Sequence, residues 1–574
     1  MNLKRFTIFA VLLLLPSAIA AQSLEPSAAK IQQNVTYLAS DALDGRRTGT
    51  AGANEAAKYL AKEFERLGLR PAPATDSRKI NVMLARYLQT FPYIGSVELG
   101  KNNVLSVRSG ETLRVGEDWM PLGISPNQKL DLTGVVFPGY GITANELNYN
   151  DYKGTYSKNQ VAVIQKGTPD GDNPHGRFTT AGQLRFKVAA AQSAGVGALL
   201  IISSEDDLKN DALAKLHYDN AGLAGIPVAV ISKQAAEKLA NVKEVTLRTD
   251  VVRVDVPAHN VVGVIEGADP VLKNESIVIG AHYDHLGRGG EGSLAPRPGE
   301  IHHGADDNAS GTAGVLELAR IFSTQRPKLK RTLVFIAFSG EEEGLLGSNY
   351  YVNHPLMPLD KTVAMINMDM IGRMKDRKLI IGGVGTAKEW RELLIASNGG
   401  FELTMNEDGY GPSDHSSFYS KQIPVLFFWT GTHNDYHKPS DTSEKINYDD
   451  EARILSLVAR IIRDVDSADP RLTYTTAKSD PPRGGGFRVY LGTIPNYADT
   501  NEGLLLDGVR DDSPAAKAGL KAGDRVVKIG TRDVKNVYDY TAALGEMKAG
   551  QEYVIEVMRG SKKLTLKIVP QARN

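Results

Sequence analysis

VIGAHYDH, at residues 278–285, and GADDNASG, at residues 304–311 after a glycine-rich loop, decide the fold of this chain. Residues 276–281 are short, mostly apolar and β-branched, which is typical of a strand buried on both faces. This strand ends at His282 and Asp284, and the second motif leads into residues 312–322, whose apolar side chains recur at helical spacing. A strand end and a helix start therefore bring an imidazole and several carboxylates together, where ligands gather in open α/β sheets.

Length, charge and cysteine content limit the class of protein. The 574 residues predict about three domains. Lysine plus arginine and aspartate plus glutamate both number 67, so no charge imbalance indicates nucleic acid or an anionic membrane as a partner. Residues 1–21 have the basic start, short apolar run and small-residue end of a signal peptide, and the run is too short for a membrane span. We therefore expect a periplasmic or secreted protein, and with no cysteine it depends on core packing and metal.

Three more segments place polar residues after apolar strands. Residues 332–338 are followed by SGEEEGLLGS at 339–348, and residues 424–429 precede THNDYHKPSDT at 432–442. Residues 363–371 form another strand pattern that contains Asp369 among apolar neighbours. A buried lone carboxylate is costly unless it is paired or bound to metal. These segments therefore predict one polar site built from several strand ends.

Histidine and carboxylate ligands without thiolate suit zinc or a similar divalent ion. Two ions about 3.5–4 Å apart need a bridging carboxylate and two further ligands each. The short His-Glu-x-x-His signature is absent, so the site must be assembled from distant loops. Glu341 remains as a general base once five ligands are assigned at or just beyond predicted strand ends: His282, Asp306, Glu342, Asp369 and His437.

This ordered set of motifs resembles the di-zinc aminopeptidase family that includes bacterial leucine aminopeptidases and, more distantly, glutamate-carboxypeptidase-like enzymes. The resemblance covers about residues 30–115 and 256–468 and implies an α/β fold with a central mixed sheet flanked by helices. It also implies that Asp306 bridges two Zn²⁺ ions and that the peptide between Asp306 and Asp307 has an unusual geometry. His282 and Asp369 would complete one ion, and Glu342 and His437 the other.

The same resemblance assigns the remaining roles. Two divalent ions would acidify a shared water, and Glu341 would take its proton and later protonate the leaving amine. Asp284 would orient His282 through its second ring nitrogen, and Tyr410 would hydrogen-bond the developing oxyanion. The GLLGS sequence at residues 344–348 fixes Glu341 as the base and Glu342 as the ligand, instead of Glu342 and Glu343.

Other polar residues have simpler interpretations. His433 lies four residues before His437 and is ambiguous, whereas Asp441 either orients His437 or caps a helix. Consecutive residues cannot converge on one point, so residues 413–415 do not form a nucleophilic triad although their sequence is Ser-Asp-His. Three histidines are expected to line the mouth of the site as loop residues: His285, His302 and His303.

Residues 130–249 contain short β-rich runs without a ligand cluster. The sequence GYGI at 139–142 and the alanine-rich helix near 185–194 resemble a protease-associated domain. That resemblance implies a role in substrate gating or packing and no chemistry of its own. We expect His175, His217 and Tyr218 to be surface residues.

Beyond the linker SDPPRGGG at residues 479–486, residues 485–572 resemble a bacterial PDZ domain. Such domains add a peptide as an extra strand and capture its terminal carboxylate on backbone amides. The loop would be YLGT at residues 490–493, and residues 539–544 would form the groove helix. A domain that only packs on its neighbour is the alternative.

The expected organisation is a signal peptide (1–21), a zinc peptidase domain in two parts (24–120 and 256–468), a protease-associated domain (121–255), a linker (469–484) and a PDZ domain (485–574). The predicted function is an exported di-zinc aminopeptidase acting on peptide or protein substrates. Three alternatives stay open. They are a carboxypeptidase or dipeptidase of the same fold, a non-catalytic peptide-binding protein, and a glutaminyl cyclase.

Overall fold

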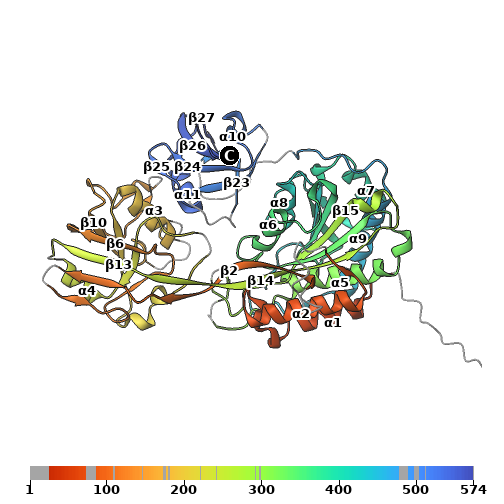
Figure 1. Ribbon diagram of the computed structural model, residues 1–574, viewed down its shortest axis with the longest axis horizontal. Helices are drawn as coiled ribbons and strands as arrows, with labels where there is room; N and C mark the ends of the chain where they lie inside the picture. Colours follow the sequence, from red (N-terminus) through yellow and green to blue (C-terminus); the bar gives the residue numbers. More distant parts are fainter. Residues whose placement is uncertain are drawn as a thin grey trace, which may run out of the picture.

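The computed structural model describes residues 25–72, 86–107, 110–144, 147–171, 176–178, 181–219, 222–240, 242–290, 292–295, 299–477, 489–496, 503–510 and 512–572. The predicted signal peptide and residues 478–484 of the predicted linker lie outside them. The described residues form three modules, with the C-terminal module lying over the junction of the other two (Figure 1). No described helix is long and apolar enough to cross a membrane.

The largest sheet is mixed and holds the two motifs that decide the fold. Its strand order is β1, β14, β16, β15, β17, β20, β18 and β19, and β2 pairs with β14. The four central strands β16, β15, β17 and β20 are parallel, whereas β14 and β18 join them in antiparallel pairing. The bounds are β1 (Arg70–Pro71), β2 (Leu88–Leu99), β14 (Val251–Ile265), β15 (Ser276–His282), β16 (Thr332–Phe338), β17 (Thr362–Met368), β18 (Lys378–Gly382), β19 (Glu402–Met405) and β20 (Val425–Trp429).

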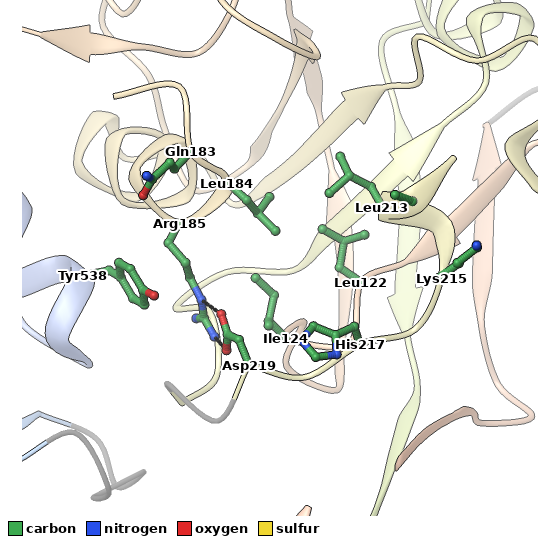
Figure 2. Close-up of a pocket in the computed structure, with 12 residues that line it drawn as sticks. Leu122, Ile124, Gln183, Leu184, Arg185, Leu213, Lys215, His217, Asp219 and Tyr538 are labelled. Carbon is green, nitrogen blue, oxygen red and sulfur yellow. Dashed lines mark hydrogen bonds and ion pairs between the residues drawn. The ribbon is translucent and has the colours of Figure 1, made fainter. Parts of the chain in front are cut away.

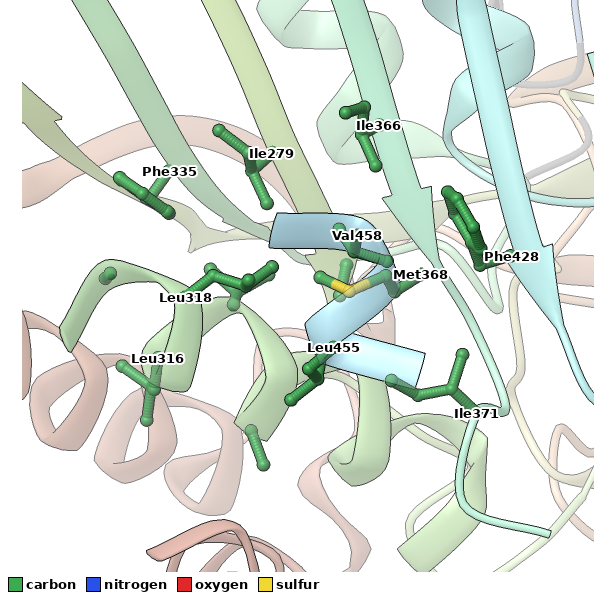
Figure 3. Close-up of a cluster of buried hydrophobic side chains, with 14 of the residues drawn as sticks. Ile279, Leu316, Leu318, Phe335, Ile366, Met368, Ile371, Phe428, Leu455 and Val458 are labelled. Atoms are coloured by element: carbon green, nitrogen blue, oxygen red, sulfur yellow. The ribbon is translucent and has the colours of Figure 1, made fainter. Parts of the chain in front are cut away.

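Helices cover both faces of this sheet because successive strand residues point to opposite sides. Ile277 and Ile279 of β15 belong to a core shared with α1, α2, α5, α7 and α9, whereas Val278 packs in a second core with α6 and α8. Figure 3 shows the first core, with Leu318 of α5 and Val458 of α9 beneath the strands. The bounds are α1 (Ala28–Leu38), α2 (Ala51–Arg66), α5 (Gly311–Ser323), α6 (Leu346–Asn353), α7 (Trp390–Ser397), α8 (His415–Tyr419) and α9 (Tyr448–Ser467).

The second module is β-rich. It contains a five-stranded sheet of order β5, β12, β11, β10, β7 and a four-stranded sheet of order β4, β3, β13, β6. The long strands β2 and β14 run from the large sheet toward it (Figure 1). The bounds are β3 (Val104–Val107), β4 (Thr112–Leu113), β5 (Trp119–Pro121), β6 (Gln128–Leu132), β7 (Gly134–Val136), β8 (Thr143–Ala144), β9 (Tyr149–Asn150), β10 (Gln160–Gln165), α3 (Leu184–Ala194), β11 (Ala198–Ile202), β12 (Val228–Ile231), α4 (Lys233–Leu239) and β13 (Val245–Thr249).

The C-terminal module is a small sheet with the order β22, β23, β24, β26, β27, and β25 pairs with β24. Helix α11 contains the segment expected to be the groove helix. The bounds are β21 (Val489–Tyr490), β22 (Thr493–Pro495), β23 (Leu504–Val509), α10 (Pro514–Lys517), β24 (Asp524–Ile529), β25 (Arg532–Asp533), α11 (Val537–Glu546), β26 (Tyr553–Arg559), β27 (Lys562–Ile568) and β28 (Gln571–Ala572). The predicted fold class, a mixed α/β sheet flanked by helices, is confirmed.

Candidate metal centre

The central parallel strands end at one edge of the sheet, and their ends carry the candidate ligands. His282 is the last residue of β15, Glu341 and Glu342 follow β16, Asp369 follows β17, and His437 lies in the loop after β20. The carboxyl ends of parallel strands meet at the same edge of a sheet. Side chains from distant parts of the sequence therefore converge.

His282, Asp307 and Asp369 form a first group. His282 Nε2 lies 3.4 Å from Asp307 Oδ1 and 3.4 Å from Asp369 Oδ1. All three residues are buried, and one donor atom from each lies within 4.8 Å of the others. The Ser413 hydroxyl donates to Asp369 Oδ2 over 2.8 Å, so the other oxygen of Asp369 is left to face the histidine.

Glu342, Asp307 and two histidines form a second group. His437 Nε2 lies 3.2 Å from Asp307 Oδ2 and 3.2 Å from Glu342 Oε2. His285 Nδ1 lies 2.6 Å from Glu342 Oε1. Asp307 therefore belongs to both groups, with one carboxylate oxygen facing each.

The carboxylates of the two groups stabilise the charged form of the histidines beside them. Burial lowers the pKa of His437, but hydrogen bonds to Asp307 and Glu342 outweigh it and raise that pKa to about 11. Burial opposes and Asp369 favours the charged form of His282, whose pKa ends well above its usual value. His282 Nε2 and Asp369 Oδ1 are buried without a hydrogen-bond partner. Orphaned buried atoms and a histidine and carboxylate donor set fit divalent ions such as zinc.

The structure does not bring Asp306, the expected bridging ligand, to either group. Asp306 Oδ1 accepts from the Gly372 backbone N–H over 2.7 Å, and its Oδ2 lies 3.1 Å from His433 Nε2. Neighbouring side chains on this turn point in different directions, so a shift of one residue exchanges a ligand for a structural carboxylate. The cis peptide is shifted in the same way, because it joins Asp307 to Asn308. The assignment of Asp306 is therefore corrected to Asp307.

Asp441 holds the backbone of this turn. Its Oδ2 accepts from the N–H groups of Asp306 and Asp307 over 2.9 and 3.1 Å. It does not orient His437, whose Nδ1 instead lies 2.8 Å from the Gly292 carbonyl oxygen. The expected roles of Asp441 were to orient His437 or to cap a helix, and its contact with the turn was missed.

Gly304 and Arg46 complete the support of the turn. Gly304 has φ 56°, and a Cβ there would lie 2.2 Å from the Asp307 carbonyl oxygen and 2.5 Å from the His285 ring. Only glycine fits such a close approach at positive φ. The buried Arg46 guanidinium donates to the carbonyl oxygens of Gly304 and His303 over 3.0 and 2.7 Å.

Glu341 lies beside the first group, where a general base is expected. Its Oε2 is 3.7 Å from His282 Nε2. Burial raises the pKa of Glu341 well above its usual value, with help from Asp369 and against the effect of His282. Asp284 Oδ1 lies 3.7 Å from His282 Nδ1 and accepts from the Glu341 N–H over 3.3 Å. The Thr48 hydroxyl holds the other Asp284 oxygen at 2.9 Å.

The third glutamate of the triplet has a different partner. Glu343 pairs with Arg47 at 2.9 Å and is in neither ligand group. This geometry favours the register in which Glu341 is beside the groups and Glu342 is within them.

Tyr410 points away from the ligands. Its ring packs edge-on against Tyr419 with centroids 4.6 Å apart, and a Cβ at Gly508 of the C-terminal module would lie 1.9 Å from its hydroxyl. The structure therefore does not bring Tyr410 to the position expected for an oxyanion donor. Tyr436, which sequence reasoning missed, stacks on His437 with ring centroids 3.8 Å apart. Burial raises the Tyr436 pKa, and the carboxylates of the site add to this effect.

The three histidines expected at the mouth of the site lie in two different environments. His302 Nε2 lies 2.7 Å from the Ser293 hydroxyl and His303 Nε2 lies 2.8 Å from Asp41, as suits loop residues. His285 was expected with them but is fully buried against Glu342. Its place in the VIGAHYDH motif, one residue after Asp284, was the available signal.

The side chains of residues 413–415 diverge. Ser413 bonds to Asp369, whereas the buried His415 ring stacks on Phe427 with centroids 4.4 Å apart. Burial lowers the pKa of His415 to about 3. In the β-rich module His217 is exposed as expected, but Tyr218 is buried beneath Arg253, so its expected exposure is corrected. His175 lies outside the described residues.

Comparisons with known proteins identify the family of this chain. Residues 260–462 match the family described as Peptidase family M28, and residues 490–569 match a PDZ domain. Aminopeptidase YwaD of Bacillus subtilis (strain 168) is 26% identical over 450 residues, which are 76% of this chain and 87% of the relative. The uncharacterized protein YfbL of Escherichia coli (strain K12) is 30% identical over 240 residues, which are 36% of this chain and 71% of the relative. The chain belongs to peptidase family M28.

Solved structures of similar proteins cover most of this M28 chain. A zinc aminopeptidase from Bacillus subtilis aligns with a TM-score of 0.48 and 23% identity over 77% of this chain and 96% of that one. An aminopeptidase from Aneurinibacillus sp. strain AM-1 aligns with a TM-score of 0.46 and 22% identity over 80% and 97%. The expected family and PDZ domain are confirmed. The two segments that match family models, residues 260–462 and 490–569, do not include residues 121–255. The protease-associated domain and the domain boundaries therefore stay predictions.

Proposed function

We propose that this M28 chain is a zinc-dependent aminopeptidase that removes residues from the free amino terminus of peptides. The observation that carries the proposal is the pair of ligand groups sharing Asp307, with Glu341 beside them. Aminopeptidase YwaD, which matches most of this chain, supports the choice of reaction.

Two zinc ions fit the donor set. His282 and Asp369 would hold one ion, Glu342 and His437 the other, and the two oxygens of Asp307 would reach both. Zinc supplies Lewis acidity, which lowers the pKa of water and polarises a carbonyl. Because a ligating histidine must be neutral, zinc binding would release the protons that the carboxylates hold on His282 and His437.

Glu341 is the group that moves the proton. A buried carboxylate with a raised pKa takes a proton from the attacking water and returns it to the leaving amine. Asp284 orients His282 through its backbone carbonyl oxygen, which lies 3.2 Å from His282 Nδ1. Its carboxylate accepts from the Thr48 hydroxyl and from the Glu341 N–H, which positions the start of the Glu341 loop. Tyr436, beside His437, replaces Tyr410 as the candidate hydroxyl that donates to the developing oxyanion.

The test is product analysis by mass spectrometry on one peptide series. The purified, zinc-loaded protein is given peptides that are free at both ends, acetylated at the amino end, or amidated at the carboxyl end. Cleavage that stops on acetylation and continues on amidation establishes the aminopeptidase. Cleavage that stops only on amidation identifies a carboxypeptidase, and an intact, zinc-loaded protein that cleaves nothing refutes a peptidase.

We also propose that the chain is exported through residues 1–21 and that the PDZ groove takes a peptide with a free terminal carboxylate. Residues 490–493 supply the backbone amides for that carboxylate. N-acetylated peptides with free or amidated carboxyl ends, compared by fluorescence anisotropy, test the second statement without being substrates for an aminopeptidase. Amino-terminal sequencing of the protein recovered from the periplasm or medium tests the first.

A further inference from the structure

The PDZ domain contacts both other modules through different sides. Helix α11 packs against α3 of the β-rich module. There the Arg185 guanidinium lies over the Tyr538 ring, 5.3 Å from the ring centroid (Figure 2). Arg532 donates to the Ala189 carbonyl oxygen over 3.0 Å, and Asn536 donates to the Leu223 carbonyl oxygen over 3.2 Å. These contacts fix one side of the domain.

A second contact joins the PDZ domain to residues 408–410 of the catalytic domain, the module that holds the candidate metal centre. Arg510, just after β23, pairs with Asp408, and its guanidinium lies 6.0 Å from the centre of the Tyr410 ring. The Tyr410 hydroxyl packs onto Gly508, where a side chain has no room. The Arg510 and Asp408 side chains are only 14% and 27% exposed, so solvent screens this pair less than a surface ion pair.

The contacted loop continues directly to the metal centre. The Asp408 carboxylate accepts from the Tyr410 N–H over 3.0 Å, which makes residues 408–410 a tight turn. Three residues later the Ser413 hydroxyl donates to Asp369 Oδ2 and accepts from Asn367, each over 2.8 Å. An anchor on Asp408 therefore restrains the segment that fixes the orientation of a candidate metal ligand.

We infer that Arg510 of the PDZ domain is a positioning residue for the metal centre, acting through Asp408 and Ser413 on Asp369. The inference rests on the proposed peptidase function for its kinetic consequence. Without Arg510 the turn at residues 408–410 loses its outer anchor, and Ser413 holds Asp369 less well. The loss falls on turnover and on zinc affinity because Asp369 is a candidate metal ligand. The effect is indirect, because neither Arg510 nor Asp408 lies within the ligand groups.

The PDZ peptide loop is one hydrogen bond from the same arginine. The Arg510 N–H donates to the Gly492 carbonyl oxygen over 2.7 Å, and Gly492 lies in the segment expected to bind a terminal carboxylate. The position of Arg510 is therefore set by this loop as well as by Asp408. This arrangement makes the PDZ domain a structural part of the catalytic site.

A double-mutant cycle tests the inference. Arg510→Gln and Asp408→Asn are each expected to lower kcat for leucine p-nitroanilide about fivefold while KM changes less than twofold. The double variant should lose no more than either single variant, because residues in direct contact are not additive. Arg510→Lys keeps the charge and should recover part of the rate. Zinc affinity, measured by competition with a chelator, should weaken about threefold in both single variants.

Arg559→Gln is the matched control. Arg559 pairs with Asp524 inside the PDZ domain, so its loss changes that domain without touching the Asp408 loop. Unchanged kcat and zinc affinity in Arg510→Gln, additive losses in the double variant, or an equal loss in Arg559→Gln would each overturn the inference. If the wild-type protein cleaves no peptide, the proposed function fails, and the zinc affinities still decide the inference.

Discussion

Two sheets of this molecule share parallel strands but differ at their carboxyl ends. In the β-rich module β7, β10, β11 and β12 are parallel, as are β16, β15, β17 and β20 in the catalytic domain. After β10 and β11 of the β-rich sheet, Lys166 pairs with Asp211 at 2.8 Å and the Ser203 hydroxyl donates to it over 2.6 Å. The carboxylate there is balanced by the protein itself.

At the catalytic edge the carboxylates face histidines instead of a lysine. Asp307, Glu342 and Asp369 face two histidines whose pKa values are raised by the carboxylates around them. The topology supplies a place for ligands at both edges, whereas among the described residues the clusters of histidine and carboxylate donors that could hold a metal ion lie only at the catalytic edge.

Replacing Asp307, which belongs to both ligand groups, should have the largest effect on activity and on bound zinc. Asp307→Asn is expected to lower kcat/KM at least about a thousandfold and to reduce bound zinc below two ions, because one side chain serves both groups. Zinc content is measured by plasma mass spectrometry after gel filtration, and activity on leucine p-nitroanilide.

Asp306→Asn and Asp211→Asn are the matched variants for this test. Both should keep two zinc ions, since Asp306 bonds to Gly372 and His433 and Asp211 to Lys166 and Ser203. Full loss of zinc in Asp306→Asn with normal content in Asp307→Asn would restore the original assignment from sequence.

Removing the proposed base should separate chemistry from binding. Glu341→Gln is expected to lower kcat by about a thousandfold or more while zinc content stays that of the wild type, because the proposed role of Glu341 is to move a proton and it lies outside both ligand groups. Glu343→Gln is the control, since Glu343 pairs with Arg47. Loss of zinc from the Glu341 variant would identify a ligand instead of a base.

His285 should have an intermediate effect. Its Nδ1 lies 2.6 Å from Glu342 Oε1, and loss of such a supporting contact typically weakens metal binding 10–100-fold. His285→Leu is therefore expected to weaken zinc binding at the second group, which contains Glu342, by about that factor, as measured by titration calorimetry. His285→Asn keeps a donor near the Nδ1 position and should bind zinc more tightly than His285→Gln, and equal affinities would argue against the hydrogen bond.

The sequence predicted the strands, the edge and most of the convergent residues, because buried strands have strong periodic patterns and end at chemically distinct residues. It placed Asp306 among the ligands where the structure places Asp307, because the choice between them depends on the turn set by Gly304, Arg46 and Asp441.

Tyr410 shows a second limit of sequence reasoning. Its local sequence matched the expected position of an oxyanion donor, but its side chain packs on Gly508 of another domain. A contact made across about a hundred residues of chain leaves no periodic signal near Tyr410. Tyr436 was missed for a similar reason, because its position beside His437 depends on the path of the loop that carries both residues.

The two regions also contain buried carboxyl groups whose pKa values are shifted in opposite directions, with a small expected effect on stability. Burial and the nearby Asp306 raise the pKa of Glu451 on α9, whereas Lys166 and Ser203 outweigh burial and lower the pKa of Asp211. A raised carboxyl pKa gives stability that is present below the unfolded value near 4.3 and is lost as pH rises. A lowered pKa gives stability that is present above the unfolded value near 3.9 and is lost as pH falls.

The two buried carboxyls should therefore respond to neutral substitution in opposite directions. Glu451→Gln is expected to raise the apparent Tm relative to wild type by about 2–4 °C at pH 8 and by less at pH 5, since the amide carries no charge to bury. Asp211→Asn should lower it at pH 7, with a difference that shrinks below pH 4. Scanning fluorimetry of each variant beside the wild type at each pH measures both trends. Parallel trends in the two variants would show that the internal charge balance of the β-rich edge is not what distinguishes it from the catalytic domain.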